Sequence, residues 1–427
     1  MENLLWLFFV ISAIFKWFVV KLENRHVRAD PCFAELEFEI YQVVPVRKKL
    51  LRATKRTGLG FLLAILAVVF QESNGLACEI NDMLAIGGVA AGIYQYQDLN
   101  DSPDYENQGR GLLVFQPEIS FTPTENDEVF AKLGFGVGDG LMGEGRSPFI
   151  IAPWGGEIQD DYININGRSR DYLLTSWYKH TFRFSGDHTL GLTGGIIDST
   201  DYLDQNAFSN DEYTQFLNGA LVNGPNAFMP SYDMGGAVEW QIGALSLNGV
   251  VMALGDTGAP EPYNEPYSFF GFQAGYTIDS SLGEGNYRLI VDFTSESFPD
   301  PTGRSKERKI AAIASFDQQL GEVLGVWIRS GYQDDHAGIN YKGVYSGGLN
   351  ISGKLWSREL DNVGVGYAYL GGGNLEVDHS EVFEVYGRFG LNSIFAITGD
   401  IQYMKDAMKE GESPAGWILG MRLTAEF

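Results

Sequence analysis

Trp417–Phe427 (WILGMRLTAEF), the last segment of the chain, alternates between two kinds of side chain. One face carries Trp417, Leu419, Met421, Leu423, Ala425 and Phe427, and the other carries Ile418, Gly420, Arg422, Thr424 and Glu426. A period of two places these sets on opposite sides of a β-strand. Glu381–Leu391 and Tyr287–Phe293 repeat the pattern. The chain therefore contains several strands with one apolar face.

The same pattern recurs along the chain after Met83, and we predict strands at each occurrence. They lie near 84–95, 110–121, 127–138, 171–184, 187–198, 233–242, 245–254, 267–279, 286–296, 307–318, 324–335, 344–354, 361–371, 380–391, 394–404 and 416–427. Their connections alternate in length: 96–109, 139–170, 199–232, 255–266 and 405–415 are long, and 122–126, 185–186, 243–244, 280–285 and 392–393 are short.

This alternation of long and short connections is typical of outer-membrane barrels, which have short periplasmic turns and longer outer loops. A soluble sandwich or jelly roll would also alternate along its strands but would not require this rhythm or a terminal aromatic residue. Within a membrane, short strands satisfy their backbone polar groups only in a closed barrel. We therefore predict an all-β fold, a transmembrane antiparallel β-barrel of about sixteen strands.

Composition agrees with a barrel and excludes other classes. Gly accounts for 53 of 427 residues and aromatic residues for 13%, as expected for many strands with glycine-rich turns. The net charge of −25 argues against a nucleic-acid partner, since phosphate binding needs clustered Lys and Arg. Cys32 and Cys78 are the two cysteines, so a disulfide scaffold and a cysteine zinc site are excluded.

The first 77 residues have the character of targeting segments. Arg47, Lys48, Lys49, Arg52, Lys55 and Arg56 precede an apolar core at Leu59–Phe70, and Gly75-Leu76-Ala77 permits cleavage after Ala77. We interpret residues 46–77 as a signal peptide, residues 1–45 as an upstream extension and residues 78–427 as one barrel domain. A transmembrane segment at Leu4–Val20 and a lipoprotein site at Cys78 are weaker alternatives. Sequencing the exported N-terminus tests the interpretation, because residues upstream of Ala77 would contradict it.

Removing residues 1–77 makes the remaining chain more acidic. That segment holds 10 of the 30 basic and 7 of the 55 acidic residues, which leaves 20 basic and 48 acidic residues.

Signals of catalysis are weak. No Ser lies in a G-x-S-x-G motif, and the glycine clusters lack the Lys-Ser or helix pattern of phosphate loops. None of the histidines after residue 77 has a partner at metal-ligand spacing; they are His180, His188, His336 and His379. We predict no enzyme, no metal and no cofactor.

Asp198–Asn223 (DSTDYLDQNAFSNDEYTQFLNGALVN) is a long polar connection between two predicted strands. Loops of this length are usually functional. Its carboxylates and amides can pair with sugar hydroxyls, and its aromatic rings can pack against pyranose faces. A solvated surface loop, or polar side chains that hold the loop's own shape, are the alternatives. The connection 139–170 is a second candidate, carrying Arg146, Trp154, Asp160, Asp161, Tyr162, Arg168 and Arg170.

This stretch resembles the signature of the OprB-type carbohydrate-selective porins, close to G-x-F-D-x-x-D-Y-F-D-x-N-x-Y-A-N-D-x-x-T-Q-F-L-N. The matching residues are Asp198, Asp201, Tyr202, Asp204, Asn206, Asn210, Asp211, Thr214, Gln215, Phe216, Leu217 and Asn218, and the departures are Ile197, Leu203, Phe208 and Ser209. The likeness extends more loosely over 83–427. The resemblance implies a sixteen-stranded channel of the bacterial outer membrane that passes sugars by facilitated diffusion.

In general porins the third external loop folds into the lumen, and Asp198–Asp233 would be that loop. We expect inward arginines, including Arg422, to face its polar groups across the lumen. The predicted substrate or constriction residues are Asp198, Asp201, Asp204, Asn206, Asn210, Asp211, Gln215, Asn218, Trp154, Asp160, Asp161, Arg288, Arg329 and Arg388. Of these we expect Asp201, Asp204 and Asn206 near the passage, with Phe216 and Leu217 packed against the wall.

Two other functions stay open. The acidic excess would suit a non-specific or cation-preferring porin, and a soluble secreted carbohydrate-binding β-protein belongs to a different class. The expected partners are outer-membrane lipid, carbohydrate solutes and the outer-membrane assembly machinery, which would read Phe427. The barrel would be a monomer or a homotrimer.

Overall fold

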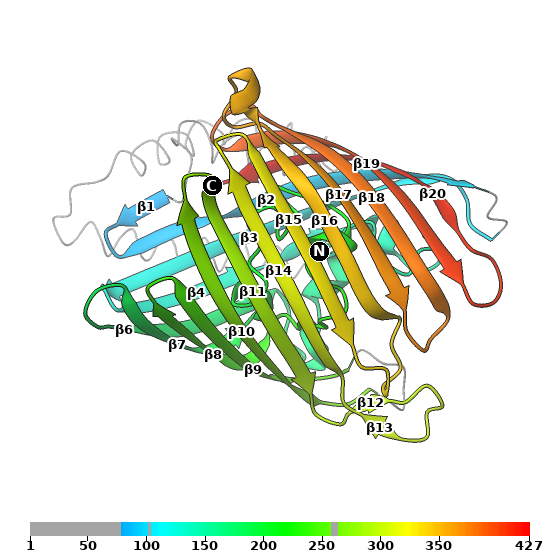
Figure 1. Cartoon of the computed structure of the whole chain (residues 1–427), viewed down its shortest axis with the longest axis horizontal. Coiled ribbons are helices and arrows are strands. Elements are labelled where there is room, and N and C mark those ends of the chain that lie inside the picture. Colours follow the sequence, from blue (N-terminus) through cyan, green and yellow to red (C-terminus); the bar gives the residue numbers. More distant parts are fainter. Residues whose placement is uncertain (1–77, 101–103, 258–263) are drawn as a thin grey trace, which may run out of the picture. The chain divides into compact units, whose positions relative to one another are not determined.

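The computed structural model describes residues 78–100, 104–257 and 264–427, which form an antiparallel β-barrel (Figure 1). The proposed upstream extension and signal peptide lie outside the described residues. The strands are β1 (Cys78–Asn81), β2 (Leu84–Asn100), β3 (Gln108–Thr124), β4 (Asp127–Leu133), β5 (Phe135–Val137), β6 (Leu173–Arg183), β7 (His188–Ile197), β8 (Asp233–Ile242), β9 (Leu245–Leu254), β10 (Tyr267–Ser280), β11 (Gly283–Thr294), β12 (Phe298–Pro299), β13 (Lys306–Glu307), β14 (Ile310–Leu320), β15 (Leu324–Gln333), β16 (Tyr341–Ser352), β17 (Asn362–Gly372), β18 (Val377–Gly390), β19 (Phe395–Met408) and β20 (Ala415–Glu426).

The main sheet contains 18 of these strands and closes into a barrel of sixteen wall strands. β4 and β5 both pair with β3 and together make one wall strand, while β1 pairs with the start of β2. Closure comes from β2 and β20, whose register runs from Val89 opposite Glu426 to Asn100 opposite Ala415. The predicted sixteen-stranded antiparallel barrel is confirmed.

The third wall strand was predicted as continuous but is interrupted at Gly134. The N–H of Gly134 donates to the carbonyl of Tyr172 at 2.8 Å instead of continuing the ladder. A Cβ at Gly134 would lie 2.3 Å from the ring of Tyr162. The interruption therefore makes room for a residue of the following loop inside the barrel. β6 pairs with β4 below this point.

Side chains of the wall strands alternate between lipid and lumen, as the sequence predicts. On β20, Leu419 and Met421 are exposed on the outer face, whereas Ile418 and Arg422 are fully buried on the inner face. Because the outer positions of neighbouring strands are also apolar, the barrel presents a hydrophobic surface suited to lipid. In the described residues no helix is both long and apolar enough to span a membrane.

Connections differ between the two ends of the barrel. One end, called here the short-turn end, carries brief turns such as 243–244 and 281–282, and its longest connection is 353–361. The other end, called the long-loop end, carries 138–172 and 198–232. The predicted asymmetry is confirmed. The predicted strand 307–318 begins later, at Ile310, because β12 and β13 form a small hairpin within the preceding loop.

The core lies inside the barrel, where long loops meet the inner wall. One buried cluster joins Phe149 and Leu221, from the two longest loops, to wall residues such as Trp327 and Tyr386. The segment 198–232, called here the inner loop, therefore crosses the lumen rather than standing in solvent. It contains a short 3-10 helix at Ser199–Asp201 and the one-turn helix α5 (Gly219–Val222).

Candidate functional site

The inner loop is folded back at its base where it leaves β7. The carboxylate of Asp198 accepts hydrogen bonds from the backbone N–H and the hydroxyl of Thr200, at 2.9 and 2.7 Å. The hydroxyl of Ser199 donates to the carbonyl of Pro230 at 2.6 Å, which joins the two ends of the loop. Asp198 therefore acts as the cap of the first turn, in the manner usual for Asp at a helix start.

A buried ion pair fixes the first half of the inner loop to β15. Asp204 Oδ2 lies 2.7 Å from Arg329 Nε, and neither side chain has any exposed surface. Arg329 also donates to the hydroxyl of Ser209 at 2.9 Å and to the carbonyl of Val222 at 3.3 Å. The Asp204 backbone N–H donates to Gln273 Oε1 at 2.9 Å. One arginine thus gathers both ends of the loop's central segment against the wall.

A second anchor holds the tip of the inner loop to β18 and β19. The carboxylate of Glu384 accepts the backbone N–H groups of Leu217 and Asn218, at 2.6 and 2.9 Å. The Asn218 side-chain amide donates to Gln402 at 2.9 Å, and its oxygen accepts from Ala220 N at 2.9 Å to cap α5. Buried backbone donors need such partners, so the tip is matched to this part of the wall.

Arg422 on β20 supplies a third attachment. Its guanidinium donates to the carbonyls of Glu212 and Gln215, the latter at 3.0 Å. The side chain is fully buried. The inner loop therefore contacts the strand that closes the barrel.

Aromatic packing accompanies these polar anchors. The ring of Phe216 lies edge-on to Trp327 and Tyr386, with centroids 5.6 and 5.0 Å apart. Gly366 leaves the space for that ring, because a Cβ there would lie 2.8 Å from it. Leu217 is fully buried as well. Both residues pack against the wall, as predicted from the sequence.

The remaining polar residues of the signature mostly bond within the loop. Asn210 N donates to Gln215 Oε1 at 2.7 Å, and the carboxylate of Asp211 accepts from Tyr213 N at 2.8 Å. Asn206 is buried and its amide donates to Ser315 at 3.3 Å. These groups determine the loop's shape, and their hydrogen-bond partners are protein atoms.

The loop 138–172 is joined to the inner loop through Glu157. Its carboxylate accepts from Gln116 at 2.9 Å, from the hydroxyl of Tyr213 at 3.1 Å and from the hydroxyl of Tyr232. Burial, followed by the negative charge of Glu157, raises the pKa of Tyr213 well above its usual value. Both tyrosines therefore remain hydrogen-bond donors, and the two long loops form one body within the lumen.

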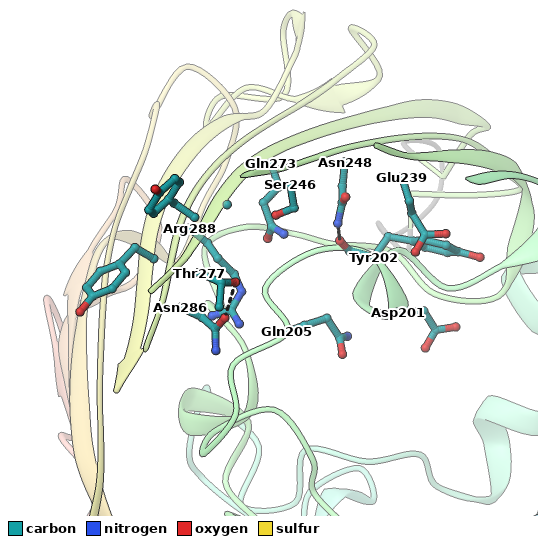
Figure 2. A pocket seen from close by; sticks show the side chains of 13 residues that line it. Asp201, Tyr202, Gln205, Glu239, Ser246, Asn248, Gln273, Thr277, Asn286 and Arg288 are labelled. Carbon is teal, nitrogen blue, oxygen red and sulfur yellow. Dashed lines mark hydrogen bonds between the residues drawn. The ribbon is translucent and has the colours of Figure 1, made fainter. Parts of the chain in front are cut away.

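An open cavity of about 210 Å³ lies between the inner loop and the wall strands β8 to β11. It is lined by Asp201, Tyr202, Gln205, Glu239, Ser246, Asn248, Gln273, Gly275, Tyr276, Thr277, Asn286, Tyr287 and Arg288. Figure 2 shows Asp201 and Glu239 on one side and Arg288 on the other, with Gln205 between them. This cavity, called here the lumen cavity, therefore carries carboxylates on one side and a guanidinium on the other.

Charges around the lumen cavity are paired along the wall. Lys179 Nζ lies 2.6 Å from Glu239, across Gly191, where a side chain would collide with Lys179. Arg288 lies 2.5 Å from Asp317. Asp201 has no such partner within the described part of the chain and is exposed to the lumen. Partial desolvation within the barrel, and then the carboxylate of Asp198, raise the pKa of Asp201 to about 7.

The comparisons with known proteins identify the family. Residues 160–427, more than half of the chain, match the model of the carbohydrate-selective porin, OprB family. The chain belongs to the OprB family. The high-pH structure of Pseudomonas putida OprB has the same fold, with a TM-score of 0.61 and 14% identity over 81% of this chain and 94% of that chain. The outer membrane channel DcaP of Acinetobacter baumannii is similar at a TM-score of 0.50 and 10% identity, over 83% of this chain and 100% of that chain.

Among curated proteins, an uncharacterized protein of Aquifex aeolicus (strain VF5) is 29% identical over 321 residues, which are 75% of this chain and 84% of that protein. Family and fold together support an outer-membrane porin and point to a channel rather than an enzyme. A closed barrel of a porin family also argues against a soluble carbohydrate-binding β-protein.

The other predicted site residues of this OprB-family porin lie in different parts of the barrel. Trp154 is fully buried, donating to the Glu157 carbonyl at 3.1 Å, while Asp160 and Asp161 are exposed in the loop 138–172. Arg388 lies at the short-turn end, where it pairs with Glu426. Of the predicted residues, the lumen cavity brings together Asp201 and Arg288.

Several residues beside the lumen were not singled out from the sequence. They include Lys132, paired with Glu118 at 2.9 Å, and the pair of Lys179 with Glu239. Each lies on the inner face of a strand whose outer face is apolar. These residues could therefore have been identified from the sequence, as charged residues at the inward positions of alternating strands.

Proposed function

We propose that this porin passes neutral mono- and oligosaccharides by diffusion along a lumen narrowed by the inner loop, and that the lumen cavity is where a sugar is weakly held. The observation that carries the proposal is the chemistry of that cavity. Carboxylates at Asp201 and Glu239, amides at Gln205 and Asn286, and the guanidinium of Arg288 line one space. Sugar hydroxyls both donate and accept hydrogen bonds, so they suit a wall that offers both functions.

The pairing of the wall charges supports the same proposal. Because Lys179 compensates Glu239 and Asp317 compensates Arg288, the cavity offers hydrogen-bond donors and acceptors with little net charge, which favours a neutral, strongly dipolar solute over a simple ion. Selectivity in channels depends on binding that is weak enough for release. The anchored signature residues contribute by holding the inner loop in place, and Asp201 and Gln205 are its polar side chains that line the lumen cavity.

Planar-bilayer conductance tests the proposal. The wild-type channel should show a small conductance in KCl that glucose or maltose reduces in a saturable way. Arg288→Met and Gln205→Ala should raise the half-blocking sugar concentration several-fold. Arg308→Met is the matched control, because Arg308 forms an exposed pair with Glu296 and neither residue lines the lumen cavity. Sugar block that is absent in the wild type, or equal in all variants, would contradict the proposal.

A cation-preferring general porin is the second candidate, favoured by the acidic excess of the chain. Such a channel would ignore sugar, and its reversal potential in a KCl gradient would show strong preference for K⁺. Liposome swelling with a panel of sugars separates the two candidates. Only the sugar channel would discriminate among solutes of similar size.

A further inference from the structure

A second cavity, of about 280 Å³, lies at the long-loop end and is called here the mouth cavity. It is lined by Ile150, Ile151, Pro225, Phe228, Lys309, Gln333, Gly338, Ile339, Asn340, Tyr341 and Leu375. Pro225 and Phe228 belong to the inner loop, so the cavity adjoins the outer side of the constriction. Its lining residues are mostly apolar, and Lys309, Gln333 and Asn340 add polar surface. Lys309 contributes its one charge.

Lys309 differs from the other lysines of the described residues. Its ammonium group has no oxygen partner there, and it lies over the rings of Phe298, 4.1 Å from the centroid, and Phe228, at 5.9 Å. The others bond carboxylates or carbonyls; they are Lys132, Lys179, Lys306, Lys342, Lys354, Lys405 and Lys409. An ammonium over aromatic rings is stabilised by their quadrupoles but retains free hydrogen-bond donors.

The surroundings of Lys309 favour an anionic ligand. Burial lowers the pKa of Lys309 to about 8, so the side chain remains mainly protonated at neutral pH. Its half-buried position means that an acceptor would relieve part of the desolvation of the ammonium. Because the chain is strongly acidic, an ammonium group without an ion-pair partner beside a cavity marks a place where an anion would be attracted.

We propose that the mouth cavity binds sugars that carry a carboxylate, with the carboxylate at Lys309 Nζ and the sugar ring against Phe228 and Ile339. The inference rests on the proposed sugar passage and adds an acidic class of substrate to it. The apolar wall suits the C–H face of a pyranose, and the exposed amide of Asn340 can pair with a hydroxyl. The lining of the cavity holds one lysine and no arginine, so it lacks the bidentate fork that is often used for phosphate.

Its position makes the mouth cavity an entry site. A uronate held there would lie next to the inner loop before it reaches the constriction. Release into the lumen would then require only the loss of one charge-assisted contact. Neutral sugars lack that contact and would pass without pausing at Lys309.

The test uses the full barrel in planar bilayers, with sodium glucuronate added at the long-loop end and glucose as the neutral comparison. Glucuronate should block the wild-type channel at lower concentration than glucose. Lys309→Met should raise the half-blocking glucuronate concentration by about tenfold or more, the loss of one charge-assisted hydrogen bond, and leave glucose block unchanged. Lys309→Arg should keep most of the glucuronate block.

Lys306→Met is the matched control, since Lys306 is exposed and pairs with Glu265 at 2.6 Å. Heat-modifiable gel migration and unchanged KCl conductance verify that each variant is folded. Glucuronate block that is equal in wild type and Lys309→Met overturns the inference. Failure of the proposed function looks different: glucose would not block any variant, while glucuronate block would still depend on Lys309.

Discussion

Arg329→Met is the substitution that most directly tests how the inner loop is held. Asp204 and Arg329 are 2.7 Å apart, and both side chains are fully buried. Methionine has similar length but no charge, so the Asp204 carboxylate would lose its cation and stay out of water. Breaking a buried pair by removing one partner typically costs about 3–5 kcal/mol. The hydrogen bonds to Ser209 and Val222 would be lost with it.

This cost acts on the loop, because the hydrogen-bonded ladder of the wall strands does not involve either side chain. We therefore expect the inner loop to leave its place while the barrel stays closed. Single-channel KCl conductance should rise and sugar block should weaken, with heat-modifiable migration retained. The double variant Asp204→Asn with Arg329→Met should recover part of the narrow conductance, since it leaves no uncompensated charge.

Arg308→Met serves as the control for Arg329→Met. Its exposed pair with Glu296 should contribute only about 0–1 kcal/mol, so conductance and sugar block should match wild type. If Arg329→Met also matches wild type in both measurements, the buried pair does not hold the loop and the reasoning is refuted.

Three further variants probe the same loop. Glu384→Gln should destabilise the loop tip by about 1–3 kcal/mol, because one acceptor of the Leu217 and Asn218 N–H groups becomes a donor. The destabilisation should appear as faster proteolysis of the loop, and unchanged cleavage would count against the anchor. Phe216→Ala should destabilise the packing of the loop by about 3–5 kcal/mol, because a cavity is left beside the wall. The noise of the single-channel current should increase, and unchanged noise would contradict this expectation. Asp201, with its pKa near 7, should make cation preference rise between pH 6 and 8, roughly as the carboxyl ionises, and reversal potentials of Asp201→Asn should lack that step.

The raised pKa of Asp201 should also make the stability of the fold depend on pH. Because folding raises its pKa, from 3.8 to about 7, the folded state binds more protons than the unfolded state between these values. Stability should therefore fall as pH rises through this window. The Asp201→Asn variant should have a flatter profile of unfolding against pH, measured by denaturant titration.

The wall could be predicted from sequence because each strand reports its own orientation. Lipid on one side and lumen on the other impose a period of two, and this local pattern located all sixteen strands. The interruption at Gly134 could not be predicted, since it depends on the ring of Tyr162, a contact made across a long loop. The start of β14 at Ile310 likewise depends on the hairpin of β12 and β13.

The signature stretch located the inner loop but not the orientation of its side chains. Asp204 and Asn206 were expected near the passage, and both are buried against wall residues, Arg329 and Ser315. Asp201 is exposed to the lumen. A polar side chain that bonds solute and one that bonds the wall look alike in sequence, because the partner lies on a distant strand.

The contact between Arg422 and the inner loop has a consequence for the order of assembly. Arg422 lies on β20, the strand that pairs with β2 to close the barrel, and it donates to the carbonyls of Glu212 and Gln215. That attachment forms only after the C-terminal strand has been inserted. A barrel without β20 in place therefore lacks one attachment of the inner loop, and its lumen would be wider and more permeable. The lumen reaches its final width only when the wall is closed.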